Sequence, residues 1–276
     1  MQSNLKVWTG LGLATALAGA TLAGCADNGE AEGDTDVAAQ AGAVGDGEGG
    51  EGEGGEGGES GEGGVSADAA ASDPVAYGSA LAVAEAHAVA ARDAYAAGRT
   101  EEAMQMFVHP ISEVLADLDP VFEQLGVDDL EPLFTQAAQA VQAGESQDQV
   151  EARYDAIIEG LRSAATKAPE GDQGDAMVAA GIISDQIGRA NAMYRISTNT
   201  GQYDPYLDGY GLYKVAEGMF ERSRSQIAGA DADLAERIGA SLELLGRAYP
   251  GAERPESADV EQSELVAAHN RIRLSL

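Results

Sequence analysis

From residue 74 onward, apolar and polar positions follow the spacing of helices rather than of strands. Alanine, the strongest helix former, is the dominant residue, and no stretch shows sustained alternation with β-branched residues. Short runs with glycine or proline, such as Ala97-Gly98-Arg99 and Pro169-Glu170-Gly171-Asp172, separate the segments. The pattern predicts helices near residues 75–97, 100–122, 128–143, 147–167, 174–200, 206–228, 231–248 and 257–273. We therefore expect an all-α fold.

Glycines recur seven residues apart within these segments. They are Gly174, Gly181 and Gly188, then Gly211 and Gly218, then Gly239 and Gly246. A glycine inside a helix costs about 1 kcal/mol relative to alanine, but this spacing puts the glycines on one face, where a neighbouring helix can approach closely. The pattern predicts a soluble antiparallel helical bundle of about eight helices. Its expected core includes Leu81, Phe107, Ile111, Leu115, Leu118, Phe134, Ile157, Leu161, Ile183, Ile187, Leu242 and Leu245.

The N-terminus has the features of an export signal. Lys6 precedes an apolar run from Val7 to about Ala20, which is too short to span a bilayer, and Leu22-Ala23-Gly24-Cys25 follows. This tetrapeptide resembles the lipobox of bacterial lipoproteins. The resemblance implies removal of residues 1–24 and attachment of lipid to Cys25, which would anchor the protein in a membrane. The alternative is an ordinary signal peptide followed by a chance cysteine.

Residues 25–73 are expected to form a disordered acidic tether. Their centre is almost entirely glycine and glutamate, and residues 27–73 contain fourteen acidic residues and no lysine or arginine. Such a segment buries too little apolar area to offset its ordering entropy. The helical domain then spans residues 74–276. The formal net charge of the whole chain is −31, which excludes nucleic acid as a partner because phosphate backbones repel an acidic surface.

Two histidines flank the first predicted turn symmetrically. His87 lies eleven residues before Gly98 and His109 eleven residues after it. At about 1.5 Å of rise per residue, an antiparallel hairpin closing at Gly98 brings both imidazoles to one level. Glu113 follows His109 by four residues and shares its face on a continuous helix. We predict a metal site in which the two histidines supply nitrogen ligands and the glutamate supplies an oxygen.

This donor set suits iron, zinc, manganese or copper, and Cys25, the only cysteine, leaves the helical domain without a thiolate ligand. A structural interpretation also stands. Pro110 is comfortable at the first position of a helix, so that His109 is an N-cap, and His87 is a partly buried histidine bonded to a backbone carbonyl.

A second, weaker polar site is predicted from Tyr206, Asp208 and Tyr210. They follow Pro205 at the start of a predicted helix, in a chain with few aromatic residues. Phenol and carboxylate oxygens suit a hard cation or a polar ligand. The alternative is that the tyrosines pack at a corner between helices, with their hydroxyls reaching water.

The remaining chemical candidates favour structural roles. Met104 and Met106 lie two residues apart and diverge on a helix, which favours core packing over a copper site. His269 lies near the end of the last predicted helix, where it interacts favourably with the helix dipole. Motifs of haem attachment, nucleotide binding and serine hydrolases are absent from the sequence. We therefore expect no enzymatic activity.

One segment contains Met193-Tyr194, then Gly201, then Tyr206-Leu207-Asp208-Gly209-Tyr210-Gly211. It resembles a helix–loop–helix pattern of periplasmic iron-uptake helpers, including imelysin-like proteins and the accessory domains of iron permeases. In those families a Glu-Tyr pair ends one helix, and a Tyr-Gln-Asp-x-x-Gly-Phe segment follows a glycine turn. Here Met193 replaces the glutamate and Leu207 the glutamine, and the Gly-x-His-x-x-Glu motif is absent. The resemblance implies a helical bundle, an envelope location and iron handling.

Ala94-Tyr95, Gly98, Ala103 and Phe107 also resemble one helix–turn–helix unit of a tetratricopeptide repeat. The sequence therefore leaves two functions open. The first is a lipid-anchored cell-envelope protein, on the periplasmic face or the outer surface, that binds a transition metal, with iron favoured. The alternative is a tetratricopeptide-like scaffold that binds an envelope protein partner and no metal.

Overall fold

The computed structural model describes residues 66–257 and 259–276. The predicted signal peptide, Cys25 and the tether up to residue 65 lie outside these ranges. The described residues form helices and turns, which confirms the all-α prediction. The helices are α1 (Ala67–Ala70), α2 (Pro74–Ala96), α3 (Thr100–Pro110), η1 (Ile111–Leu115), α4 (Ala116–Leu125), α5 (Glu131–Gln142), α6 (Gln147–Ala165), α7 (Asp175–Thr200), α8 (Asp204–Ala230), α9 (Ala232–Ala248) and α10 (Gln262–Arg273).

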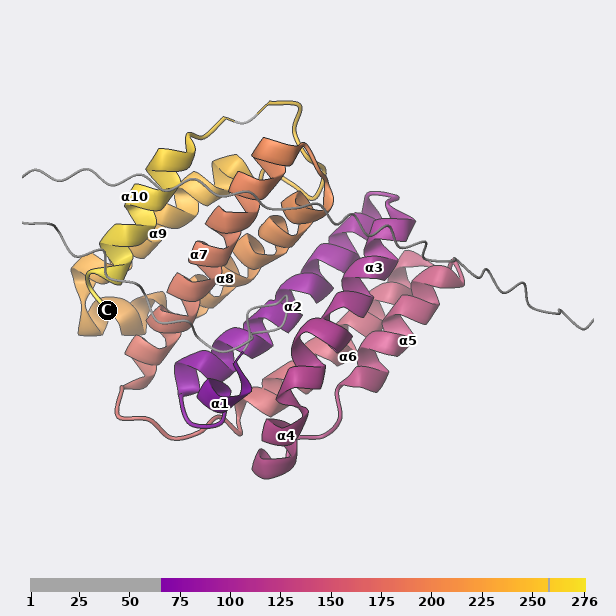
Figure 1. Cartoon of the computed structure of the whole chain (residues 1–276), viewed down its shortest axis with the longest axis horizontal. Coiled ribbons are helices and arrows are strands. Elements are labelled where there is room, and N and C mark those ends of the chain that lie inside the picture. Colours follow the sequence, from indigo (N-terminus) through magenta and orange to yellow (C-terminus); the bar gives the residue numbers. More distant parts are fainter. Residues whose placement is uncertain (1–65, 258) are drawn as a thin grey trace, which may run out of the picture. The chain divides into compact units, whose positions relative to one another are not determined.

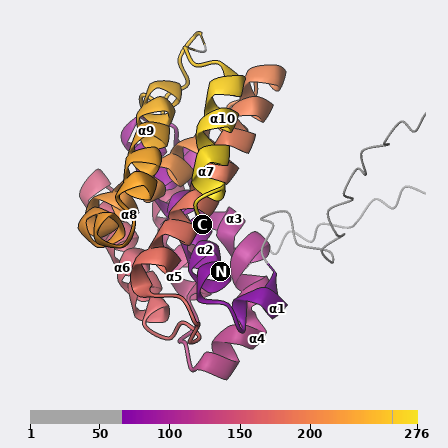
Figure 2. The ribbon, with the colours of Figure 1, turned by 90° about the vertical axis from the view of Figure 1, so that its left-hand side faces the viewer.

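Helix α2 is the centre of the bundle. It contacts α3 and α6 on one side and α7 and α8 on the other, an arrangement visible in Figure 1. Figure 2 shows α9 and α10 beside α8 and α7, farther from α2. Almost every residue of α2 from Ser79 to Ala91 is buried, as expected for a helix covered on all sides. Its alanine-rich sequence makes this possible, because small side chains let several helices approach at once.

The first hairpin closes where the sequence predicts. Asp73 caps α2, and its side chain accepts a hydrogen bond of 2.7 Å from the backbone N–H of Val75. Pro74 occupies the first turn, where its missing N–H costs nothing. After α2 ends, Gly98 adopts φ +80°, a conformation that glycine reaches without strain. Helix α3 begins at Thr100 and returns along α2.

A π-helical turn, directly after Pro110, interrupts the helix that runs back along α2. Proline has no N–H to donate and crowds the preceding turn of an α-helix. Residues Ile111–Leu115 form the wider η1 turn, and the N–H of Ala116 bonds to the carbonyl of Ile111, five residues back. The helix then continues as α4 to Leu125. Pro110 therefore changes the type of helix without ending the helical structure. His109 lies in the last turn of α3 rather than at the start of a helix. The N-cap interpretation of His109 is wrong.

The predicted close approach at glycines occurs at several but not all of the positions. A Cβ on Gly211 of α8 would lie 2.2 Å from the backbone carbonyl oxygen of Ala86 in α2. A Cβ on Gly188 of α7 would lie 2.6 Å from the ring of His269 in α10. By contrast, Gly239 has ordinary contact at 3.6 Å, and Gly174 has open space. Gly211 matters most, because it allows the backbones of α8 and α2 to meet beside His87.

Several boundaries differ from the prediction, including the end of the second predicted helix, which continues to Leu125 rather than stopping at residue 122. Residues 66–73, assigned to the tether, include α1, and Ala70 is fully buried. The last helix begins at Gln262 rather than residue 257, and the preceding loop is held by Tyr203 and Tyr206, whose hydroxyls donate to backbone carbonyls within it. Helix α5 begins at Glu131 rather than residue 128, because Asp129 accepts a hydrogen bond from the N–H of Glu131.

The predicted core residues are buried, with one exception. Ile111 is only partly buried, at the start of the π turn. Met106 is fully buried and Met104 packs against the same core, so the core-filling prediction for the methionines is confirmed. Within the described ranges, no helix has both the length and the apolar content needed to cross a membrane.

Candidate metal centre

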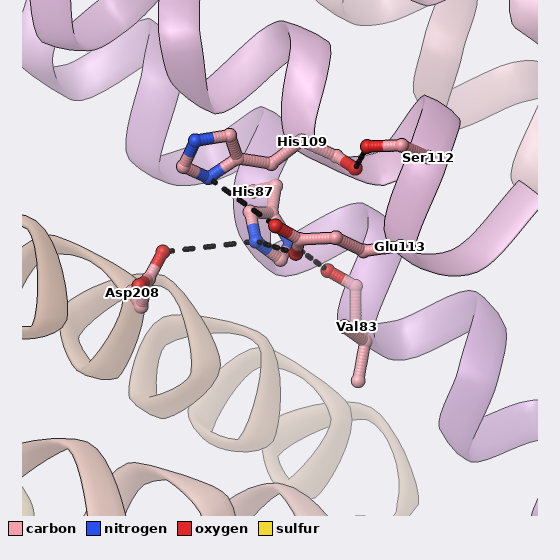
Figure 3. A network of polar contacts seen from close by, with 6 residues as sticks. All are labelled: Val83, His87, His109, Ser112, Glu113 and Asp208. Carbon is pink, nitrogen blue, oxygen red and sulfur yellow. Dashed lines mark hydrogen bonds and ion pairs between the residues drawn. The ribbon is translucent and has the colours of Figure 1, made fainter. Parts of the chain in front are cut away.

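The hairpin brings the two predicted histidines together. The ring centroids of His87 in α2 and His109 in α3 lie 5.8 Å apart, and the ring planes meet at 76°. Both residues sit eleven positions from the glycine turn, so the equal lengths of the two helical arms set this register. Figure 3 shows the two rings facing a common space between the helices.

Glu113 joins both histidines from the π turn. Its Oε2 lies 3.6 Å from Nε2 of His87, and its Oε1 lies 4.0 Å from Nδ1 of His109. The side chain of Glu113 is 22% exposed, so the carboxylate is largely withdrawn from water. Ser112, beside it, donates a hydrogen bond from its hydroxyl to the carbonyl of His109, which ties the π turn to the end of α3 (Figure 3).

A fourth side chain reaches the same space from α8. Oδ1 of Asp208 lies 3.6 Å from Nε2 of His87, and the carboxylate points toward the histidines in Figure 3. Asp208 precedes Gly211 by three residues, so it shares the face of α8 that meets α2. The close contact of Gly211 with Ala86 therefore delivers Asp208 to His87.

The tautomer of His87 is fixed by its backbone partner. Nδ1 lies 2.9 Å from the carbonyl oxygen of Val83, and since a carbonyl can only accept, Nδ1 carries the proton. Burial lowers the pKa of His87, against the opposing effects of the Val83 carbonyl and the charge of Glu113. The ring is therefore neutral at pH 7, and Nε2 presents a lone pair. The two interpretations of His87 are therefore compatible: Nδ1 forms the bond to the backbone carbonyl, and Nε2 remains available as a ligand atom.

Nε2 of His87 faces only acceptors. Two carboxylate oxygens, from Glu113 and Asp208, lie at 3.6 Å from this nitrogen, beyond hydrogen-bond range for such groups. Oδ1 of Asp208 is buried and has no hydrogen-bond donor among the described residues. Leaving a buried carboxylate oxygen unpaired is costly. Nε2 of His87 thus lies between two carboxylate oxygens, an environment that favours a cation, although the group of donors that lie mutually close is His87, His109 and Asp208, without Glu113.

The electrostatics of Asp208 agree with this arrangement. Burial, chiefly, raises the pKa of Asp208 from 3.8 to about 6; the charge of His109 opposes this rise and that of Asp204 adds to it. The carboxylate is ionised at pH 7 only at an energetic cost. A bound cation would remove that cost, because it favours the charged form.

The spacing of the donor atoms suits a first-row metal ion. His87, His109 and Asp208 each offer one ligand atom, and these three atoms lie within 4.8 Å of one another. Metal–nitrogen and metal–oxygen bonds of about 2.0–2.2 Å place neighbouring tetrahedral ligands roughly 3.4 Å apart. The separations of 3.6 Å around His87 are close to that value.

The structure separates the three residues of the predicted second site. The hydroxyl of Tyr206 donates to the carbonyl of Gly251 at 2.7 Å, and that of Tyr210 donates to Oδ2 of Asp93 at 2.7 Å. Asp208, between them in sequence, points to the histidines instead. The tyrosines therefore pack at a corner between helices, as the alternative interpretation holds, although their hydroxyls bond to protein groups rather than reaching out to water.

His269 lies apart from the other two histidines. It packs on Gly188 of α7, and its Nε2 lies 3.3 Å from the hydroxyl of Ser184. This contact with α7 is a packing and hydrogen-bonding role that the helix-dipole interpretation does not include.

Comparison of the chain with protein-family models, with curated proteins and with solved structures gave no match. Its function is therefore inferred from the geometry of the site itself.

Proposed function

We propose that this protein binds a divalent first-row transition metal ion between α2, α3, η1 and α8, with iron favoured. Nε2 of His87 and one ring nitrogen of His109 supply nitrogen ligands, while Glu113 and Asp208 supply oxygens. The observation that carries the proposal is the surrounding of Nε2 of His87, whose lone pair faces two carboxylate oxygens at 3.6 Å.

The outer contacts support this assignment. Ligand histidines typically donate their second nitrogen to a carbonyl or carboxylate, which fixes the tautomer and orients the ring. The bond from Nδ1 of His87 to Val83 at 2.9 Å provides this support. The π turn that carries Glu113 is a second feature typical of functional positions in helices.

The donor chemistry narrows the class of ion. Magnesium and calcium prefer all-oxygen sites, whereas imidazole with carboxylate suits iron, zinc and manganese. Two histidines with one carboxylate also form the facial ligand set of non-haem Fe(II) proteins. Iron is favoured further by the resemblance of the Tyr194–Gly211 segment to iron-uptake helpers.

The proposed role is binding at the cell envelope rather than catalysis. It joins the metal site to the predicted lipid anchor at Cys25, which would hold the helical domain at the periplasmic face or the outer surface. Its membrane contact would be the lipid, and nucleic acid is not a proposed partner because of the charge of −31.

The tetratricopeptide-like scaffold has less support. A repeat of about 34 residues leaves room for two short helices of similar size. Here α5 and α6 have 12 and 19 residues, whereas α7 and α8 have 26 and 27. Such unequal pairs do not stack as copies of one unit.

Elemental analysis of protein purified without a histidine tag tests the proposal. The wild type, loaded with Fe(II) without oxygen or with Zn(II), should retain about one ion per chain after dialysis, and replacing His87 and His109 together with alanine should abolish retention. Asp128→Asn, which changes an exposed carboxylate, is the matched control and should bind as the wild type does. Equal metal content in the double variant, or none in the loaded wild type, would reject the assignment. A metal-free wild type that captures one defined envelope protein would favour the scaffold.

A further inference from the structure

A concave site lies between α7, α10 and the start of α2. The pocket has a volume of about 610 Å³ and is lined by Asp73, Val75, Gln173, Met177, Gly181, Ser184, Asp185, His269, Arg273 and Leu276. Small-molecule sites in proteins have volumes of roughly 300–1,000 Å³. Val75 and His87 are twelve residues apart on α2, or about 18 Å along its axis. This pocket is therefore separate from the proposed metal centre.

The pocket is built by two glycine contacts. A Cβ on Gly181 would lie 3.0 Å from the side chain of Val75, so the bare backbone of α7 lets the start of α2 form one wall. Gly188 does the same for the ring of His269, which lies against α7 with Nε2 3.3 Å from the hydroxyl of Ser184. His269 is thus held in place at the wall.

The charged side chains of the pocket wall differ in whether they have partners within the protein. Asp73 accepts the N–H of Val75 at 2.7 Å, and Asp185 accepts Nε of Arg189 at 2.8 Å. Both carboxylates therefore have donors. Arg273, in contrast, forms no hydrogen bond or ion pair with any described residue, although the protein is strongly acidic. Arg273 follows His269 by four residues, so both face the pocket from one side of α10.

The pocket also has an apolar side. Val75 and Met177 line it together with the glycine backbone of α7. An arginine with a histidine one turn away favours a planar anion, since a guanidinium donates two parallel hydrogen bonds to a carboxylate. We propose that this pocket binds a small carboxylate with a short alkyl chain, its charge beside Arg273 and His269. The alkyl chain lies along Val75 and Met177.

Histidine NMR signals offer a direct test with hexanoate as the probe. The full-length metal-free protein, labelled with ¹³C-histidine, gives one imidazole signal for each of three histidines, and His269→Gln identifies the signal of His269. Hexanoate should shift that signal in a saturable way and leave those of His87 and His109 in place. Hexylammonium, which has the same chain and the opposite charge, should bind at least about 10-fold more weakly.

Two arginine variants of α10 separate the pocket from general charge effects. Arg273→Gln should weaken hexanoate binding about 10-fold or more, since it removes a charge-assisted contact. Arg271→Gln removes the same charge from the same last turn but does not line the pocket, and it should bind hexanoate as the wild type does. The proposal fails if no saturable shift occurs, if both variants bind equally, or if hexylammonium binds as tightly. The metal proposal shares none of these residues and would be unaffected.

Discussion

Within five residues, α8 contains polar groups in two environments: in one they have hydrogen-bond partners, and in the other a buried oxygen has none among the described residues. Tyr206 and Tyr210 direct their hydroxyls to Gly251 and Asp93, each at 2.7 Å. Asp208, between them, turns to the other face, where its Oδ1 meets no donor among the described residues. The tyrosine corner is thus complete without a ligand, whereas the histidine face leaves a buried carboxylate oxygen without a donor among the described residues, and this is where we propose a cation. The three residues are neighbours in the sequence, which therefore predicts that they form one site. On the helix, the tyrosines contact one set of partners and Asp208 lies beside the histidines.

The largest expected effect comes from neutralising the unpartnered carboxylate. Asp208→Asn should weaken metal binding about 100-fold or more, because losing even an outer-shell partner costs 10- to 100-fold. Competition titration against a chromophoric chelator measures the change. Tyr210→Phe, two residues along the same helix, is the control: it removes the bond to Asp93 and should alter metal affinity less than about threefold. Similar losses in both variants would show that the two environments do not differ as described.

A smaller effect is expected from separating the two helices that form the histidine face. Gly211→Ala places a methyl group 2.2 Å from the carbonyl oxygen of Ala86, and the strain should lower the free energy of unfolding by about 1–3 kcal/mol. Metal affinity should fall as well, since Asp208 moves away from His87. Urea unfolding and the same titration give both values.

Gly239→Ala is the matched control for Gly211→Ala. Its Cβ would meet Phe220 at an ordinary 3.6 Å, so the gain in helix propensity should leave the protein equally stable or more stable by up to about 1 kcal/mol. If Gly211→Ala is as well tolerated as this control, α8 does not need the bare backbone there to reach α2.

An effect on stability of similar size concerns the metal-free protein and pH. The pKa of Asp208 is raised by burial from 3.8 to about 6, so between these values the folded state binds a proton more tightly than the unfolded state. The contribution of Asp208 to stability is therefore present below about pH 4 and is lost as pH rises to about 6. Asp208→Asn should stabilise the metal-free protein by about 1–3 kcal/mol at pH 7 and have little effect at pH 4.

Urea unfolding at the two pH values measures this difference. Asp128→Asn should stay within about 0.5 kcal/mol of the wild type throughout, as an exposed substitution does. A destabilising effect of Asp208→Asn at pH 7 without metal would mean that the ionised carboxylate has a partner within the protein.

The sequence groups three of the four side chains of the candidate metal centre and assigns the fourth, Asp208, to a different site, for a physical reason. Equal arms on either side of Gly98 fix the level of His87 and His109, because a short turn leaves the two helices no other register. Asp208, in contrast, follows His87 by more than a hundred residues in the sequence. The glycine spacing around Gly211 predicts a face of close approach but does not identify the helix that fills it, since Gly211 meets α2 while Gly188 meets α10.

The fold shows the same difference between features set by local sequence and features set by contacts between distant segments. Helix periodicity and turn residues are local, and the observed helices follow them closely. The π turn exists because the helix continues past Pro110, and its residues contact α2 and α5, which are separate elements of the chain. The late start of α10 depends on hydrogen bonds from Tyr203 and Tyr206 to the preceding loop, which local sequence does not encode.

The most direct test of the central claim is anomalous diffraction from crystals of the Fe(II)-loaded protein, collected on both sides of the iron absorption edge. The account predicts one strong peak about 2.0–2.2 Å from Nε2 of His87, with His109, Asp208 and Glu113 as the surrounding donors. A peak bound elsewhere on the protein, or no peak while these four side chains keep their positions, would contradict it.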